Sequence, residues 1–212
     1  MISAKYRLVQ PYDNKMHSTG IIYVAIANLS REIRFKRKNM LILGILLGPS
    51  EPSLHQINHY LSPIVDKLMQ LWQGVMLDST AENRNRKMIR AALILVSCDI
   101  PAARKVCGHI SALISCHRCK KKANYVNNQY NYGGMDDMKE WFISRDLTTH
   151  RRNSIEWRSC NSTAARKRFV SENNVRWSEL FRLPYFNPIR HLVIDSMHCL
   201  FLDIGKWLVK RI

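Results

Sequence analysis

One aspartate and one cysteine pair are the side chains of this sequence best placed to do chemistry. Asp99 follows a continuous apolar run, residues 91–96, and precedes Pro101 at the expected start of a helix. Folds that alternate strands and helices place ligand-binding groups at the C-terminal ends of buried strands. Asp99 is therefore a candidate metal-binding carboxylate, although an aspartate before a proline-led helix more often caps that helix.

Cys116 and Cys119 have two residues between them, which is the spacing of half a zinc site. A closed site takes four ligands, and the candidates to complete it are His109, Cys107, His198 and Cys199. Two cysteines one turn apart at the end of a helix also pack together simply as thiols. The spacing leaves the zinc site and the packed pair as equal alternatives.

Asp195 repeats the arrangement of Asp99, because it follows the short apolar run 191–194 and precedes an expected helix. His198 lies in the first turn of that helix, where a histidine that binds no metal is common. The sequence contains no glycine-rich phosphate loop, no nucleophile elbow and no His-Glu-x-x-His zinc helix. These absences argue against the enzyme classes that those motifs define.

The elements that would position these residues alternate between strands and helices. Short apolar runs predict strands at 21–27, 40–47, 91–96 and 191–194. Ser53 and Gln56 have the spacing of a capping box, and an apolar stripe at helical intervals follows them to Leu71. Pro63 would either kink this helix or restart it.

The rest of the chain predicts further helices, joined by polar or irregular segments. Helices are expected at 101–114, 135–145, 162–172 and 196–211. The helix at 196–211 would have its apolar side chains on its inner side: Met197, Leu200, Phe201, Ile204 and Leu208. Residues 78–86 are expected to be a loop, 120–134 a loop or an insertion joining the core, and 178–188 an irregular apolar segment. The pattern predicts an α/β domain with an insertion.

The composition indicates a folded protein with an anionic partner. Of its 212 residues 46% are hydrophobic, which is enough for a substantial core. Its 33 lysines and arginines exceed its 16 acidic residues, so that the formal charge is +17. This excess favours nucleic acid, with an anionic membrane surface as the other candidate. No apolar run reaches membrane-spanning length, no secretory signal is present, and the six cysteines are expected to be reduced thiols or metal ligands.

Four stretches, taken in order, carry a family resemblance. They are Asn28-Leu-Ser-Arg with Asn39-Met-Leu-Ile-Leu-Gly and Gly48-Pro-Ser-Glu-Pro; Tyr60-Leu-Ser-Pro through Leu71-Trp-Gln-Gly; Asp99-Ile-Pro-Ala-Ala-Arg-Lys-Val-Cys-Gly-His with the cysteine pair; and Leu183-Pro-Tyr-Phe with Ile194-Asp-Ser-Met-His. The ordered set, more than any one block, resembles the catalytic domain of CACTA-type (En/Spm-like) DDE transposases. It spans nearly the whole chain.

The resemblance implies a ribonuclease-H-like fold, a mixed sheet flanked by helices. In that family three acidic residues hold two Mg²⁺ or Mn²⁺ ions, which activate the attacking oxygen and stabilise the leaving one during DNA strand cleavage and transfer. Asp99 matches the family's second catalytic aspartate. Cys116 and Cys119 match a signature suited to Zn²⁺, and His198, in the Asp-x-Met-His block, is preferred to Asp195 as a further ligand.

The sequence departs from the family at its first and third acidic positions. The first aspartate should lie a few residues before Gln10-Pro-Tyr, where this sequence has Arg7. The third belongs on a helix beyond the Asp-x-Met-His block, and the sequence stops at Ile212. One carboxylate cannot hold two hard cations. We therefore expect a catalytically incomplete transposase fragment that does not cleave DNA alone.

The expected organisation has three parts. Residues 1–119 would form a partial ribonuclease-H-like core, 120–188 a basic insertion, and 189–212 the last strand and helix of the truncated core. The expected partners are DNA and further copies of the chain, with neither a membrane nor a small-molecule substrate, and the resemblance implies a nuclear location. The alternative function is a non-catalytic, basic nucleic-acid-binding module, either with or without a stabilising zinc ion. A third alternative is an unstable remnant without activity.

Overall fold

The computed structural model describes residues 2–9, 19–50, 52–53, 55–80, 84–109, 116–121, 124–131, 143–195, 200–201 and 205–210. Within them the chain is a mixed α/β structure built around one five-stranded sheet. Its strands are β1 (Ile2–Val9), β2 (Thr19–Ile26), β3 (Met40–Leu46), β6 (Leu93–Cys98) and β9 (Leu192–Ile194). They lie in the order β3-β2-β1-β6-β9.

The sheet is mixed, because β1, β2 and β3 are antiparallel to one another while β6 and β9 are parallel to β1. The strands predicted near 21–27, 40–47 and 191–194 are confirmed within one or two residues. The run at 91–96 forms β6 two residues later than predicted. β1 is missing from the sequence prediction because basic and polar residues interrupt its apolar positions.

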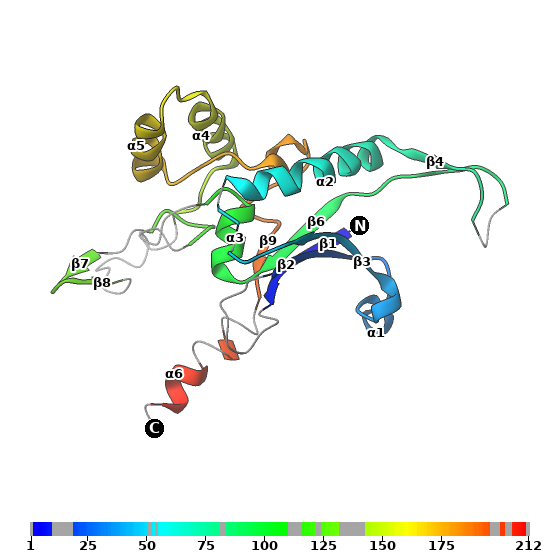
Figure 1. Cartoon of the computed structure of the whole chain (residues 1–212), viewed down its shortest axis with the longest axis horizontal. Helices are drawn as coiled ribbons and strands as arrows, with labels where there is room; N and C mark the ends of the chain where they lie inside the picture. The colour runs from blue at the N-terminus through cyan, green and yellow to red at the C-terminus, as the bar shows by residue number, and fades with distance from the viewer. Residues whose placement is uncertain are drawn as a thin grey trace.

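Helix α2 (Gln56–Gln73) runs along the sheet (Figure 1). The predicted capping box is confirmed, since the Ser53 N–H donates to Gln56 Oε1 at 2.8 Å and the Gln56 N–H donates to Ser53 Oγ at 3.3 Å. Pro63 lies within the helix without ending it. The buried stripe is the predicted one and consists of Ile57, Leu61, Val65 and Leu68.

Helix α3 (Ile100–Val106) is shorter than the predicted helix at 101–114. It ends before Gly108, whose φ of 68° lies in the left-handed region that commonly terminates helices. His109 then forms an antiparallel bridge with Val175 instead of continuing the helix. The rest of the predicted helix, from residue 110, lies outside the described residues.

Two short hairpins lie outside the five-stranded sheet. β4 (Val75–Leu77) and β5 (Lys87–Ile89) flank the loop predicted at 78–86. β7 (Asn124–Val126) and β8 (Gln129–Asn131) form a hairpin within the segment predicted to be a loop, so that prediction is wrong there. Asn127 and Asn128 have φ values of 51° and 59°, which two-residue hairpin turns require and which asparagine tolerates.

Helices α4 (Leu147–Ser159) and α5 (Thr163–Asn173) form a pair at one end of the molecule (Figure 1). The helix predicted at 162–172 is confirmed as α5. The helix predicted at 135–145 is wrong at residues 143–145, which are not helical, and the preceding residues lie outside the described part. α4 begins later because Asp146 caps it, accepting a hydrogen bond from the Thr149 N–H at 2.7 Å.

The C-terminal helix predicted at 196–211 is described only in part. Lys206–Val209 form α6, while 196–199 and 202–204 lie outside the described residues. Leu200, Phe201 and Leu208 are exposed, so the prediction that they face inward is wrong. The basic connection after β2 holds α1 (Arg31–Arg34) and η1 (Arg37–Asn39). None of the helices described has the length and apolar character needed to cross a membrane.

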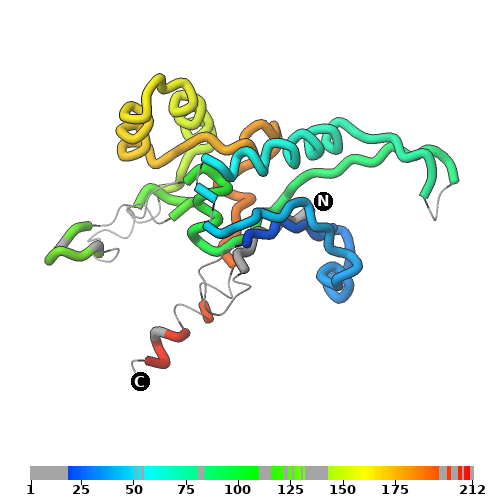
Figure 2. Tube along the Cα trace, viewed as in Figure 1, coloured from blue at the N-terminus to red at the C-terminus, as the bar shows by residue number. Residues whose placement is uncertain are grey.

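The chain returns to the core after α5. Figure 2 shows this segment running from α5 back towards α2. It contains η3 (Glu179–Arg182), and Leu180, Leu183 and Phe186 are buried in the same apolar cluster as residues of α2, α3 and the sheet. The irregular apolar segment predicted at 178–188 is therefore part of the core.

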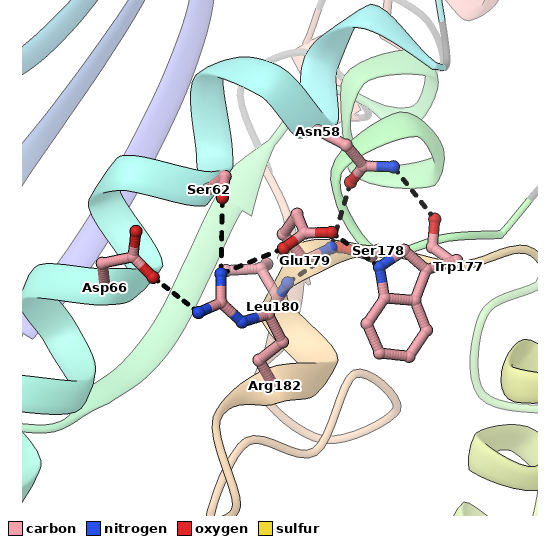
Figure 3. Close-up of polar contacts among 8 residues, drawn as sticks. All are labelled: Asn58, Ser62, Asp66, Trp177, Ser178, Glu179, Leu180 and Arg182. Atoms are coloured by element: carbon pink, nitrogen blue, oxygen red, sulfur yellow. Dashed lines mark hydrogen bonds and ion pairs between the residues drawn. The ribbon is translucent and has the colours of Figure 1, made fainter. Parts of the chain in front are cut away.

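Polar contacts fasten this segment to α2 (Figure 3). Asn58 on α2 accepts a hydrogen bond from the Glu179 N–H at 3.0 Å and donates to the Trp177 carbonyl at 3.3 Å. Arg182 forms ion pairs with Asp66 on α2 at 2.5 Å and with Glu179 at 3.1 Å. These contacts hold η3 against α2 and, through α2, fix its position relative to the sheet.

Candidate functional site

Asp99 and Asp195 lie next to each other at the C-terminal edge of the sheet. The parallel strands β6 and β9 pair Cys98 with Ile194, and an aspartate follows each of these residues. The Asp195 N–H donates to the Cys98 carbonyl at 2.8 Å, which extends the ladder by one bond. The sequence places each aspartate at a strand end, but only the pairing of β6 with β9 makes them neighbours.

Asp99 caps helix α3. Its Oδ1 accepts a hydrogen bond from the Ala102 N–H at 2.8 Å, so the capping role suggested by the sequence is confirmed. The side chain is only partly buried, and a carboxylate has lone pairs beyond the one that the cap uses. A metal-binding role for Asp99 stays a prediction.

The β1–β6 ladder ends two residues before Arg7 and Asp99, and its register, continued by two residues, would place Arg7 level with Asp99. Lys5 pairs with Ser97 in the parallel ladder, and Arg7 and Asp99 each lie two residues further along the chain. The strand beside Asp99 thus carries a basic residue type where the family resemblance expects an aspartate. This difference bears directly on how many cations the sheet edge can hold.

The cysteine pair lies in a non-helical turn, residues 116–119, beside the start of α4, and the residues directly before it lie outside the described part of the chain. Cys119 forms an antiparallel bridge with Ser144, and Arg145 Nε donates to the Cys119 carbonyl at 3.0 Å. The Arg118 N–H donates to Cys116 Sγ at 3.3 Å. Burial raises the pKa of the Cys119 thiol, and the neighbouring Cys116 thiol adds to that effect.

Three histidines gather next to this turn. The His109 and His150 rings have centroids 4.8 Å apart, and the His117 ring lies 6.2 Å from His109. His109 and His150 are each only 3% exposed. Neither ring nitrogen of either residue has a hydrogen-bond partner among the residues that the structure describes. The Pro188 carbonyl lies near the His109 ring without reaching hydrogen-bond geometry.

Both buried histidines are neutral at physiological pH. Burial lowers the pKa of His109 well below its ordinary value, and the neighbouring His150 and Arg145 lower it further. Burial and then Arg145 lower the pKa of His150 to about 4. Neutral imidazole is the form that binds a metal.

The candidates predicted to complete the zinc site lie in different parts of the structure. Of the candidates to complete the cysteine pair, His109 is brought close to the turn, whereas Cys107 is buried in the apolar core cluster. His198 and Cys199 lie outside the described residues. The zinc ligands predicted from the sequence do not include His150. Nothing in the sequence around His150 indicates that it lies near the cysteines. In the part of the chain described, no three His, Cys, Asp or Glu side chains already surround one point as metal ligands do.

Basic and aromatic side chains gather between α4, α5 and the segment that follows. We define the Arg–Trp patch as Arg158, Arg166, Arg176, Trp157 and Trp177. The Arg158 guanidinium lies 4.6 Å from the Trp177 ring centroid, and that of Arg166 lies 5.2 Å from the Trp157 ring centroid. Arg176 is 8% exposed, and its Nε and Nη2 atoms have no hydrogen-bond partner among the described residues.

The Arg–Trp patch carries a local excess of positive charge. Burial lowers the pKa of Arg176 to about 10, a value at which the guanidinium is still charged at neutral pH. Burial, followed by the charges of Arg166 and Arg176, lowers the pKa of the adjacent His55. Arg151 on α4 has a different role, since it donates to the carbonyls of Leu183 and Phe186 at 3.1 and 2.8 Å.

The mixed sheet, with an aspartate after each of two neighbouring parallel strands, and the helix pair α4 and α5 define an α/β protein. The model of the transposase family tnp2 matches residues 9–175, well over half of the chain. The chain therefore belongs to this family of CACTA (En/Spm) type transposases. No curated protein sequence matches it significantly.

Proposed function

We propose that this chain is the DNA-binding, ribonuclease-H-like core of a DDE-type transposase and acts in the nucleus. In this proposal it holds one divalent cation at the sheet edge and does not cleave DNA by itself. The observation that carries the proposal is the adjacency of Asp99 and Asp195 at the ends of two parallel strands. A mixed sheet packed against α2 and α3 supports the same fold class.

The sheet edge suits one hard cation. Mg²⁺ in proteins is commonly held by one or two carboxylates together with substrate phosphates. Asp99 and Asp195 would be those carboxylates, and the ion would supply positive charge to polarise a phosphate oxygen. Arg7, which the continued register of β1 would place level with Asp99, offers no anionic ligand for a second ion. In this proposal the chain does not cleave DNA strands by itself, because it lacks this ligand.

Replacing Asp99 by asparagine is expected to abolish Mn²⁺ binding at the sheet edge while leaving the fold intact. Asparagine caps helices as well as aspartate does, so Asp99→Asn removes the charge and keeps the cap on α3. Water-proton relaxation during a Mn²⁺ titration would measure the binding. Asp195→Asn should have the same effect, and Asp78→Asn, at an exposed ion pair with Arg86, should have none.

Cleavage assays on supercoiled plasmid test the other half of the proposal. The purified chain with Mg²⁺ or Mn²⁺ is expected to leave the plasmid intact. Metal-dependent nicking that disappears in Asp99→Asn and persists in Asp78→Asn would contradict it. Mn²⁺ binding that all three variants retain would rule out the proposed cation site.

The Arg–Trp patch is the surface that we propose contacts DNA. Arg158 and Arg166 hold positive charge beside indole rings, and phosphate oxygens would accept hydrogen bonds from these guanidinium groups. Guanidinium groups with aromatic neighbours suit both phosphates and unstacked bases. Family membership supports DNA as the polyanion.

Arg158→Gln combined with Arg166→Gln is expected to weaken DNA binding and flatten its dependence on salt. Removing one phosphate-binding arginine lowers the slope of log K against log salt by about 0.9, so the double variant should reduce the slope by roughly 2. Fluorescence anisotropy at several salt concentrations measures this. Arg86→Gln, at the β4–β5 hairpin, is the matched control. If Arg86→Gln reduced the salt slope as much as the double variant, the Arg–Trp patch would not be the DNA-binding surface.

The second candidate function is a non-catalytic nucleic-acid-binding module. Arg7 at the level of Asp99 favours it, because an arginine there cannot serve as a ligand for two-metal chemistry. DNA binding that shows salt dependence but no response to Mg²⁺ would select this alternative.

A further inference from the structure

His109 and His150 are two buried histidines in contact with each other and without hydrogen-bond partners among the described residues. Both are almost fully buried, and all four of their ring nitrogens lack a hydrogen-bond partner there. Buried polar groups in native proteins are nearly always paired, so an unpaired group in a structure indicates a partner such as water or an ion. An imidazole nitrogen that carries no proton offers a lone pair to such a partner.

The spacing of the two rings suits a shared metal ion. Two imidazoles bound to one tetrahedral zinc, each with a Zn–N bond of about 2 Å, have ring centroids about 5 Å apart. The His109 and His150 centroids are 4.8 Å apart. His117 lies further away, 6.2 Å from His109, and the Leu192 carbonyl lies near its ring.

The cysteine turn lies next to this histidine pair. Arg145 Nε donates to the Cys119 carbonyl, and the Arg145 charge acts on both cysteine thiols and on both buried histidines. His150 is one turn into α4, whose capping residue Asp146 directly follows Arg145. The Arg118 N–H that donates to Cys116 Sγ would stabilise a thiolate at that atom.

We propose that Cys116, Cys119, His109 and His150 form a structural zinc site. Two thiolates and two neutral imidazoles are a common ligand set for a closed tetrahedral zinc site, and the two thiolates balance the charge of the ion. The metal would draw the four side chains together, since they do not yet converge on one point. It would thereby join the end of α3, the cysteine turn and the start of α4.

Metal analysis of the purified full chain tests the site. We expect one tightly bound zinc per chain, and Co²⁺ substitution should give the intense visible bands of a tetrahedral site with thiolate charge transfer. His150→Asn and Cys119→Ser should each weaken Co²⁺ binding by more than about 100-fold, because each removes a direct ligand. Circular dichroism of each variant separates loss of metal from loss of fold.

Three variants serve as matched controls. Cys160→Ser and His59→Asn change a cysteine and a histidine outside the cluster and should retain full Co²⁺ absorbance. His117→Asn should retain it as well, because His117 is excluded from the ligand set. Absence of zinc and of the cobalt bands would overturn the site, and so would bands that survive His150→Asn or disappear in His117→Asn. These measurements use neither DNA nor Mg²⁺, so their failure leaves the proposed function untouched.

Discussion

Gly108→Ala is expected to lower the free energy of unfolding by about 2–5 kcal/mol and the melting temperature by roughly 10 °C. Gly108 ends α3 with φ of 68°, which costs an alanine about 1–2 kcal/mol. An alanine Cβ would also lie 2.5 Å from the Arg176 carbonyl oxygen. This clash is with backbone, so relief requires the strand-like bridge at 109 and 175 to move. Thermal and urea unfolding of the purified chain measures the change.

Gly44→Ala is the matched control. A Cβ at Gly44 would meet nothing within 4 Å, and its φ lies outside the left-handed region. The free energy of unfolding should then change by less than about 1 kcal/mol, and any change should be an increase in stability. If Gly108→Ala proved as stable as Gly44→Ala, the close approach of residues 108 and 176 would be wrong.

Phe186→Ala is expected to destabilise the whole chain by about 3–5 kcal/mol, because it leaves a large cavity in the core. Phe186 is fully buried, in the same cluster as residues of α2, β6 and α3. If the segment at 178–189 is part of one cooperative core, the variant should unfold in a single transition at lower urea concentration. Fluorescence and circular dichroism should report the same midpoint.

Phe35→Ala is the comparison for this variant. Because Phe35 is 56% exposed, its replacement should hardly change the free energy of unfolding. A two-step unfolding curve of Phe186→Ala, in which the sheet persists after the segment has unfolded, would contradict a single core. The boundary predicted at residue 188 between insertion and core stays a prediction. Leu180 and Leu183 nevertheless lie with the core residues.

The sequence predicts the elements whose signals are local. The capping box at Ser53 and Gln56 and the apolar stripe behind it specify α2 almost completely. Short apolar runs likewise predict β2, β3 and β9. Helix ends are less predictable, since the apolar spacing after Val106 continues although Gly108 stops the helix.

The candidate sites depend on long-range pairing, which local patterns do not contain. Asp99 and Asp195 are each predictable as strand-end residues, yet their adjacency requires β6 to pair with β9. His109 and His150 come together only because the chain turns back at Gly108 and α4 starts beside the cysteine turn. An isolated histidine in a polar helix gives no indication of such a neighbour.

The pairing of β6 with β9 also has a consequence for biosynthesis. β1, β2, β3 and β6 all leave the ribosome before β9, which closes the outer edge of β6. Until β9 emerges, that edge offers unpaired N–H and C=O groups to any other nascent chain. Leu180, Leu183 and Phe186 also reach the core cluster late in translation. Protection by a chaperone during this interval would therefore favour correct folding.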